Sequence, residues 1–427
     1  MNTSLFPDTA TGHPRIDRLN AWLFQGLLFG MVFFAIAARR PDILTNAQPW
    51  AEDGVVWMME IHNNGFWSSI FLPQNGYYQT ISKLTYGFAL LFGVGKAALV
   101  ANVVAIAVRG LLVLFLLSQR MKFIQLPYRL AVAIYLVLMP NLGEGYVNIT
   151  NVHWYTAIYM MMVLAAEPPR SRGWAAHDMA VLVISALSGP FVAFYAPCLA
   201  IKRWHEHGGI VQAIRRANLF DWVMAACLAL QVVAILVSST SDRSTAPLGA
   251  SLPMLAQIIQ QRVVLGSFLQ GTPIPLPDSS WPPVALLAVL TASIGVAAWR
   301  HGWRYQILAL FPILMIGFAL AKPMISLTEP QWPVLLNAGA GERYFFVTNF
   351  FMFCHVVFLI SRLGRFAHTG LLLLSMAMLP LYVACFKIPP LAEVGYKDQI
   401  GRFQQLPKGE TMMIDINPPG WKMQLTR

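Results

Sequence analysis

The sequence predicts an all-α, polytopic membrane protein, a helix bundle of about eleven transmembrane helices. Of its 427 residues, 57% are hydrophobic and only 11% are charged, and the mean hydropathy is +0.56. Apolar runs near the ~20 residues that cross a bilayer recur along the chain. Runs such as 98–118 and 219–239 are apolar all round, whereas a transmembrane β-barrel would need strands of roughly 10 residues with alternating polarity.

The net charge of +11 comes from small basic clusters at the ends of these runs. Such clusters orient membrane helices, since Lys and Arg are enriched in cytoplasmic loops. A nucleic-acid-binding protein would gather them in one domain or stripe, so we do not expect nucleic acid as a partner. The four cysteines lie inside apolar runs without zinc-type spacing, so the sequence predicts neither a disulfide framework nor a zinc site.

The first apolar run, residues 19–38, is interpreted as an uncleaved anchor that leaves the N-terminus in the cytoplasm. It ends in Ala-Ile-Ala, which could pass for a cleavage site, but it is longer than the ~7–15 apolar residues of a signal peptide. The first outer loop, residues 39–97, follows. We expect its moderately apolar run, residues 78–93, to lie along the membrane interface, because a span here would place the basic residues of 120–129 outside.

Ten further spans complete the predicted bundle, residues 1–386, and every inner loop between them is basic. The spans are residues 98–118, 130–139, 153–166, two short spans within 175–201 that break at Ser188-Gly189-Pro190, 219–239, 284–299, 306–321, 345–360 and 369–386. They leave a second outer loop at 140–153, a long outer loop at 240–282 and a third outer loop at 322–344. Residues 387–427 form a polar tail on the outer side.

Polar residues that could carry chemistry fall mainly in the outer loops. They are Glu52, Asp53, Gln74, Tyr77 and Lys83 in the first, Glu144, Asn148, Asn151 and His153 in the second, and Arg343 and Tyr344 at the end of the third. An outward-facing cavity would bring these clusters together. A carboxylate there could act as a general base on an acceptor hydroxyl or hold a divalent cation, and an arginine could bind a phosphate bidentately.

Structural roles are the alternative for each cluster. Glu52 and Asp53 could begin an interfacial helix, whose N-terminal dipole favours acidic residues. Arg343 could anchor a helix end before an aromatic run, and the second outer loop could be a solvated turn with a structural His153. Arg109 lies within a span, where a charge costs about 2.5–3.5 kcal/mol, so we expect it either to face the bundle interior or to snorkel to the membrane surface, in a structural role.

The order of motifs resembles the GT-C superfamily of membrane glycosyltransferases. WAEDG followed by GYY, PNLGEGYVNITN, SGPF, GERYFF and the terminal INPPGW is similar to bacterial multi-spanning glycosyltransferases of cell-surface polysaccharide modification. The resemblance implies transfer of a sugar, with inversion, from a polyprenyl-phosphate carrier to a glycan or lipid acceptor. The reaction would take place at the outer face of the bacterial inner membrane, among membrane lipids.

Residue roles follow from the same resemblance. Asp53 would be the general base, with Glu52 beside it, and Arg343 with Tyr344 would bind the donor phosphate. Glu144 would match the second-loop acidic position. We expect the sugars to contact the remaining outer-loop residues, namely Asn148, Asn151, His153, Gln74, Tyr77 and Lys83. The chain lacks the large soluble domain and tryptophan-aspartate motif of metal-dependent oligosaccharyltransferases, so no cofactor is assigned, although the carboxylates could hold a divalent metal.

Two other classes of function stay open. A lipid-linked sugar transporter would also need many spans, but it should place polar groups near the bilayer midplane on broken helices. Only Ser188-Gly189-Pro190 suggests such a break. A non-catalytic scaffold would leave the outer acidic residues dispensable.

Overall fold

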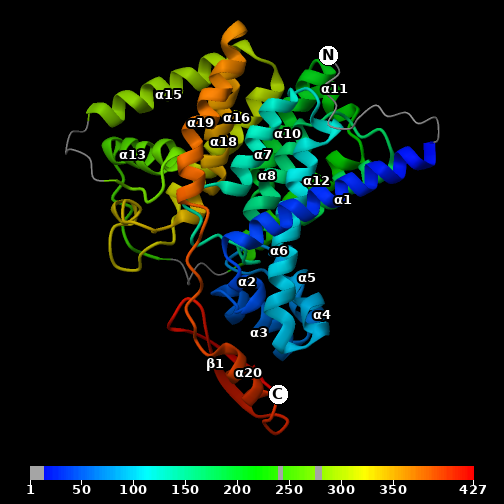
Figure 1. Ribbon diagram of the computed structural model, residues 1–427, viewed down its shortest axis with the longest axis vertical. Helices are drawn as coiled ribbons and strands as arrows, with labels where there is room; N and C mark the ends of the chain where they lie inside the picture. Colours follow the sequence, from blue (N-terminus) through cyan, green and yellow to red (C-terminus); the bar gives the residue numbers. More distant parts are fainter. Residues whose placement is uncertain (1–13, 239–243, 275–280) are drawn as a thin grey trace.

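The computed structural model describes residues 14–238, 244–274 and 281–427, which form a helical bundle with a small extension at one end (Figure 1). Each predicted span corresponds to one helix. These helices are α1 (Pro14–Arg39), α6 (Val94–Leu117), α7 (Leu126–Leu138), α8 (Val152–Ala165), α9 (Arg172–Ala186), α10 (Val192–His207), α12 (Leu219–Val237), α15 (Trp281–Arg300), α16 (Trp303–Ala321), α18 (Glu342–Ser361) and α19 (Ala367–Ala384).

Within the described residues, seven helices are long and apolar enough to cross a membrane: α1, α6, α12, α15, α16, α18 and α19. The helices α7 to α10 have only 13 to 16 residues. At 1.5 Å per residue they extend about 20–24 Å, less than the ~30 Å hydrocarbon core. The structure therefore supports a multi-pass membrane protein, while the predicted count of about eleven complete spans is not confirmed.

Helix α8 lies at the centre of the bundle. All of its residues except Trp154 are buried, as expected for a helix that is apolar around its whole circumference. It packs against α6, α9, α10, α16 and α18. The predicted break in 175–201 falls between α9 and α10, where Gly189 adopts a φ of 113°, a conformation that favours glycine.

Short helices fill the loops. They are α2 (Asp42–Thr45), η1 (Asp53–Met58), α3 (Met59–Asn64), α4 (Phe66–Ser69), α5 (Thr80–Ala89), η2 (Leu90–Phe92), η3 (Gln119–Met121), α11 (Ile210–Arg215), α13 (Leu252–Ile258), η4 (Ile259–Leu265), α14 (Gly266–Phe268), α17 (Gln331–Val334) and η5 (Gly364–Phe366). The predicted interfacial run contains α5, whose ten residues extend only about 15 Å, too short to span. Helix α5 packs along α6.

The long outer loop contains more structure than the sequence suggested. Its helices α13, η4 and α14 pack against α15 and α18. Within them, Ile258 and Val263 are buried in a small cluster with Leu320, Leu335 and Phe345. The proline-rich end of this loop lies partly outside the described residues, at 275–280.

The predicted polar tail is a folded unit. It consists of helix α20 (Tyr396–Phe403) and an antiparallel hairpin of β1 (Thr411–Ile416) and β2 (Trp421–Thr426), in which Thr411 lies opposite Thr426. Its buried hydrophobic positions alternate along the strands, as in a hairpin with one covered face: Ile414, Ile416, Met423 and Leu425. This hairpin adds two strands to the predicted all-α fold.

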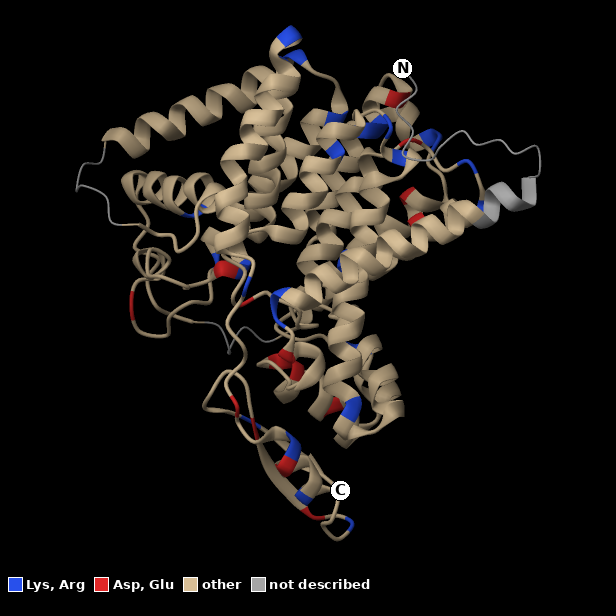
Figure 2. Cartoon of the chain, viewed as in Figure 1, with Lys and Arg blue, Asp and Glu red and all other residues tan. Residues whose placement is uncertain are grey.

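Charge is concentrated at the two ends of the bundle, and the middle carries little (Figure 2). The upper end in Figure 2 is mainly basic. The lower end faces the folded tail and carries the carboxylates of the predicted outer loops. We call the lower end the outer end and the upper end the inner end, following the predicted orientation.

Candidate functional site

The second outer loop connects the polar clusters at the outer end. Its residues Ile149 and Thr150 contact Asp53 of the first outer loop, and its Glu144 contacts Arg343 at the start of α18. Four segments that are far apart in the sequence therefore meet here, because the folded tail also contacts the first loop. The predicted gathering of the outer clusters at one end is present in the structure.

Asp53 forms a buried joint between the first two outer loops. Its side chain is 1% exposed. Oδ1 accepts hydrogen bonds from the backbone N–H of Thr150 at 2.8 Å and from its hydroxyl at 2.5 Å, and Oδ2 accepts one from the Ile149 N–H at 3.1 Å. Trp57 donates its indole N–H to the same Thr150 hydroxyl at 2.9 Å. Both carboxylate oxygens are thus occupied by the second loop.

Burial raises the pKa of Asp53 to about 7, although the hydrogen bonds from Thr150 and Ile149 act in the opposite direction. The neighbouring charge of Glu52 raises it further. A carboxylate with a pKa near neutrality suits proton transfer. Glu52 itself is half-buried, and in the described part of the chain no hydrogen bond or ion pair holds its carboxylate. The adjacent carboxylates therefore differ in access: Asp53 is enclosed and Glu52 is open.

Arg343 forms an ion pair with Glu144. Its Nη1 donates to Oε1 of Glu144, and its backbone N–H donates to Oε2 at 3.3 Å. The guanidinium carbon lies 4.7 Å from the centre of the Tyr344 ring, and Nη2 donates to the carbonyl of Met324 at 3.0 Å. Glu342 also contacts the second loop, because its Oε2 accepts from the Glu144 N–H at 3.1 Å. The pair is partly open to solvent, with side chains 30% and 22% exposed.

A small cavity beside this ion pair is nearly filled. It is lined by the second outer loop, α8 and the start of α18, including Asn151, Trp154 and Arg343, and its volume is about 10 Å³. Such a space holds at most one water molecule. A phosphate could reach the Arg343 fork only after Glu144 moves away.

The predicted second-loop residues mainly maintain the shape of their own loop. Asn148 accepts hydrogen bonds from the backbone and side chain of Asn151 at 2.9 and 2.8 Å, and it donates to the Glu144 carbonyl at 2.8 Å. His153 is 8% exposed and packs against the rings of Trp154 and Phe191, with ring centroids 4.9 and 5.4 Å away. Phe191 belongs to the SGPF segment, so that motif packs against the second loop.

The predicted residues further along the first loop stabilise the loop itself. Lys83 is 1% exposed, and its Nζ donates to the carbonyls of Ser69 at 2.5 Å and Leu72 at 2.7 Å and pairs with Glu60 at 3.3 Å. Gln74 and Tyr77 exchange backbone hydrogen bonds of 2.9 and 3.2 Å. A sugar could contact Lys83 only if this loop opened.

Three buried arginines surround Tyr146 at the same end of the bundle. The guanidinium carbons of Arg39, Arg40 and Arg109 lie 5.3, 5.8 and 5.4 Å from its ring centre. Arg39 donates to the carbonyls that end α19, at Cys385 (2.9 Å) and Phe386 (3.1 Å), and Arg109 donates to the α7 carbonyl of Val137 at 3.0 Å.

These arginines satisfy carbonyls that helix termini leave without partners. Arg109 faces the bundle interior, which is one of the two placements expected from the sequence. The roles of Arg39 and Arg40 were missed. The signal available in the sequence was a pair of arginines directly after the first apolar run.

The folded tail positions the segment before Glu52. Asn417 accepts a hydrogen bond from the Ala51 N–H at 2.5 Å and donates its own N–H to the Pro49 carbonyl at 3.2 Å. A Cβ on Gly54 would lie 2.5 Å from Cδ1 of Ile416, so a larger residue here would displace the Ile416 side chain of the hairpin. The INPPGW motif therefore packs against PWAEDG and is hydrogen-bonded to it, a contact that was not predicted from the sequence.

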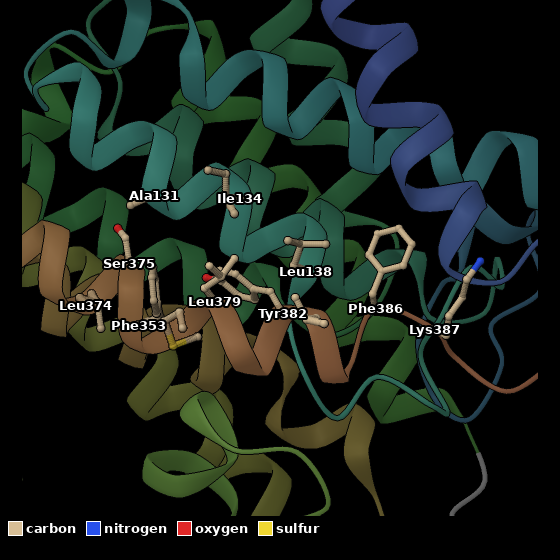
Figure 3. A pocket seen from close by; sticks show the side chains of 12 residues that line it. Ala131, Ile134, Leu138, Phe353, Leu374, Ser375, Leu379, Tyr382, Phe386 and Lys387 are labelled. Atoms are coloured by element: carbon tan, nitrogen blue, oxygen red, sulfur yellow. The ribbon is translucent and has the colours of Figure 1, made fainter.

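A lipid-facing apolar groove reaches the same end. It has a volume of about 610 Å³ and lies between α7, α18 and α19. Figure 3 shows Ile134 and Leu138 of α7 facing Leu379 and Tyr382 of α19, with the groove continuing to Lys387. The Nζ of Lys387 donates to the Ala38 carbonyl at 2.9 Å, next to the arginine cluster.

The carboxylates fit a resident metal poorly. Across the described ranges, no three His, Cys, Asp or Glu side chains lie close enough together to hold a metal ion. Asp53 has both oxygens occupied by the second loop, which leaves Glu52 as a single open ligand. We therefore derive no step through a metal.

Comparison with known proteins gives a structural likeness at low sequence identity. No protein-family model and no curated protein matches the sequence. The structure is similar to the oligosaccharyltransferase of Archaeoglobus fulgidus, whose crystal structure is a complex with zinc and sulfate. The match has a TM-score of 0.41 and 11% identity, and it covers 90% of this chain and 56% of the archaeal one. The chain thus spans little more than half the length of that protein, and likeness at this level identifies neither a family nor a substrate.

Proposed function

We propose that this protein is a membrane glycosyltransferase of the GT-C type that moves a sugar from a polyprenyl-phosphate carrier to a glycan or lipid acceptor, with its active site at the outer end. One observation carries the proposal: the second outer loop contacts Asp53, beside Glu52, on one side and Arg343 on the other. An arginine of this kind can bind a phosphate bidentately. The chemistry of sugar transfer needs a base for the acceptor and a cation for the departing phosphate.

The proposed reaction is a single displacement. The acceptor hydroxyl oxygen forms a bond to the anomeric carbon, and the bond from that carbon to the phosphate oxygen breaks on the opposite face. The bonding electrons leave with the carrier phosphate, and the hydroxyl proton passes to the carboxylate pair. Arg343 stabilises the departing phosphate through its planar fork, once Glu144 has released it.

The carrier tail would lie in the apolar groove between α7 and α19. Each buried CH₂ of a lipid chain contributes about 0.8 kcal/mol, so an isoprenoid tail stays in the membrane. The groove ends at Phe386 and Lys387, at the level of the buried arginines. A carrier held there would present its phosphate at the outer end of the bundle.

The base is one of two adjacent carboxylates. Asp53 is the residue that the motif resemblance proposes, and its pKa of about 7 suits the role. Glu52 has the more open side chain, and in the part of the chain that the structure describes no group competes for its oxygens. We keep Asp53 as the proposed base, with Glu52 orienting the acceptor, and the test compares the two.

The test measures sugar transfer in liposomes containing the full chain and defined polyprenyl-phosphate sugars. Asp53→Asn should lower the rate by about 10²–10⁴-fold, the usual contribution of a general base, and Glu52→Gln should lower it less. Asn cannot accept all three hydrogen bonds without turning its NH₂ toward a backbone N–H. Unfolding must therefore be measured on the same preparations, with Thr150→Val as a control that also weakens the joint but keeps the carboxylate.

Three outcomes decide the assignment. A large loss in Asp53→Asn, with a small one in Thr150→Val, supports Asp53 as the base. The reverse ranking, with Glu52→Gln as the inactive variant, transfers the role to Glu52. Near-normal transfer by both Asp53→Asn and Glu52→Gln would rule out acid–base chemistry at this pair.

A further inference from the structure

A second cavity opens at the inner end of the bundle and extends to η4 of the long outer loop. None of the residues proposed for sugar transfer is among its lining residues. Its volume is about 630 Å³, within the range of ligand pockets. Helices α7, α15, α16 and α18 contribute to its walls, and η4 contributes Ile259 and Val263. The cavity is lined by four helix ends that face the inner side: the first turn of α7, the end of α15, the start of α16 and the end of α18.

The polar part of this cavity is basic. Its lining includes Arg129, Arg304, Arg362, His301 and His355, and none of the described residues that line it is Asp or Glu. Arg304 already has a partner, since its Nη2 pairs with Glu167 at 3.0 Å and its Nε donates to the Ala165 carbonyl at 2.8 Å. His355 is held by Ser293 at 3.1 Å and Tyr305 at 2.8 Å.

Two of the arginines, Arg129 and Arg362, have N–H groups that can still bind an anion. Arg362 is exposed, and its guanidinium carbon lies 5.0 Å from the Phe358 ring centre, but no carboxylate in the described residues pairs with it. Arg129 is 4% exposed. Its Nη1 donates to the carbonyls of Leu117 and Ser118 at 2.9 and 2.7 Å, while its buried Nε has no hydrogen-bond partner. A buried donor without a partner is unfavourable, and an anionic ligand beside Arg129 would supply the missing acceptor.

The rest of the cavity is apolar and long. Helix α15 projects to one side of the bundle in Figure 1. It packs against α16, α13 and η4. Its Leu290 and Ile294 line one wall, opposite Val132 of α7 and Phe351 of α18. The cavity thus runs from arginines at the inner end to the buried helix η4 along surfaces that match a hydrocarbon chain.

We propose that this cavity binds one anionic phospholipid of the inner leaflet, with its phosphate between Arg129 and Arg362 and one chain between α15 and α18. The basic lining and the apolar wall together select this ligand. A soluble anion would leave the apolar wall in contact with water, and a zwitterionic lipid would add the positive charge of its head group beside the arginines. The site is separate from the proposed sugar transfer and does not depend on it.

Lipid retention by the purified full chain tests the proposal. Native mass spectrometry in detergent, with added phosphatidylglycerol, phosphatidylcholine or inorganic phosphate, would count the molecules bound. We expect one tightly held phosphatidylglycerol, little phosphatidylcholine and no displacement by millimolar inorganic phosphate. Arg362→Gln should weaken retention about tenfold, the loss of one charge-assisted contact.

Matched variants separate a site from general charge effects. Arg365→Gln removes an arginine three positions further on that does not line the cavity, so its retention should stay unchanged. Ala309→Phe keeps every charge but fills the apolar wall, and it should also weaken retention. Equal binding of phosphatidylcholine and phosphatidylglycerol, competition by inorganic phosphate, or equal effects of Arg362→Gln and Arg365→Gln would each overturn the proposal.

Discussion

The second outer loop holds its two neighbours in different ways. Toward the first loop it donates three hydrogen bonds to Asp53, a carboxylate that is 1% exposed. Toward α18 it offers Glu144 to Arg343 in an ion pair whose side chains are 22% and 30% exposed. The same short loop therefore combines a fixed joint with a contact that can exchange partners.

Burial explains the difference. An enclosed carboxylate cannot leave its donors without exposing unpaired backbone N–H groups, each of which costs about 1–3 kcal/mol. The Arg343–Glu144 pair is partly open to water, with side chains 30% and 22% exposed, so competition by water weakens it toward the ~0.2–1 kcal/mol of a surface ion pair. Arg343 can thus give up Glu144 for a phosphate at little cost, while the carboxylate pair stays in place.

The largest effect should come from breaking the buried joint. Asp53→Ala leaves the N–H groups of Ile149 and Thr150 without acceptors, so the free energy of unfolding should fall by about 2–5 kcal/mol. Glu144→Ala, the matched change on the exposed side of the loop, should cost less than about 1 kcal/mol. Chemical unfolding in detergent measures both. If both variants lost a similar free energy of unfolding, the buried contact at Asp53 and the partly exposed Glu144–Arg343 pair would not differ in strength as proposed.

The pH dependence of stability sharpens the same contrast. Because the pKa of Asp53 is raised from 3.8 to about 7, the folded state binds more protons than the unfolded state between these values. The free energy of unfolding should therefore fall as pH rises from about 4 to 7, by at most ~1.4 kcal/mol per pH unit. Asp53→Asn should flatten this slope. An unaltered slope in Asp53→Asn would assign the titration to another group.

The smallest expected effect concerns binding of the carrier phosphate by Arg343. Arg343→Lys keeps the charge but loses the planar fork, so binding of a polyprenyl phosphate should weaken about tenfold with little change in stability. Glu144→Gln removes the competing carboxylate and should leave binding equal or tighter. Unchanged binding in Arg343→Lys would make Arg343 a helix anchor. Titration of liposome-bound carrier against each variant gives the comparison.

The sequence predicted those features that depend on local patterns. Apolar runs located each helix, and the basic pairs predict an orientation that places Glu52, Glu144 and Arg343 at one end of the bundle. The central position of α8 also agrees with its lack of a polar face. These properties need only hydrophobicity and length.

Long-range contacts were beyond the same reasoning. Nothing near Lys83 in the sequence shows that the carbonyls of Ser69 and Leu72 enclose its ammonium group. The approach of Ile416 to Gly54 joins segments more than 350 residues apart, so the tail was expected to be only a polar extension. The unpaired Nε of Arg129 likewise depends on how α7 packs, which no spacing rule encodes.

The account as a whole is tested most directly by following a radiolabelled sugar on a polyprenyl phosphate in liposomes that contain the protein. We expect the bond between sugar and phosphate to break, with the label released to water or acceptor as the inverted anomer and the carrier phosphate left in the membrane. Glu52→Gln combined with Asp53→Asn should abolish the release. Label that crosses the bilayer still attached to its carrier would contradict sugar transfer and identify a transporter instead.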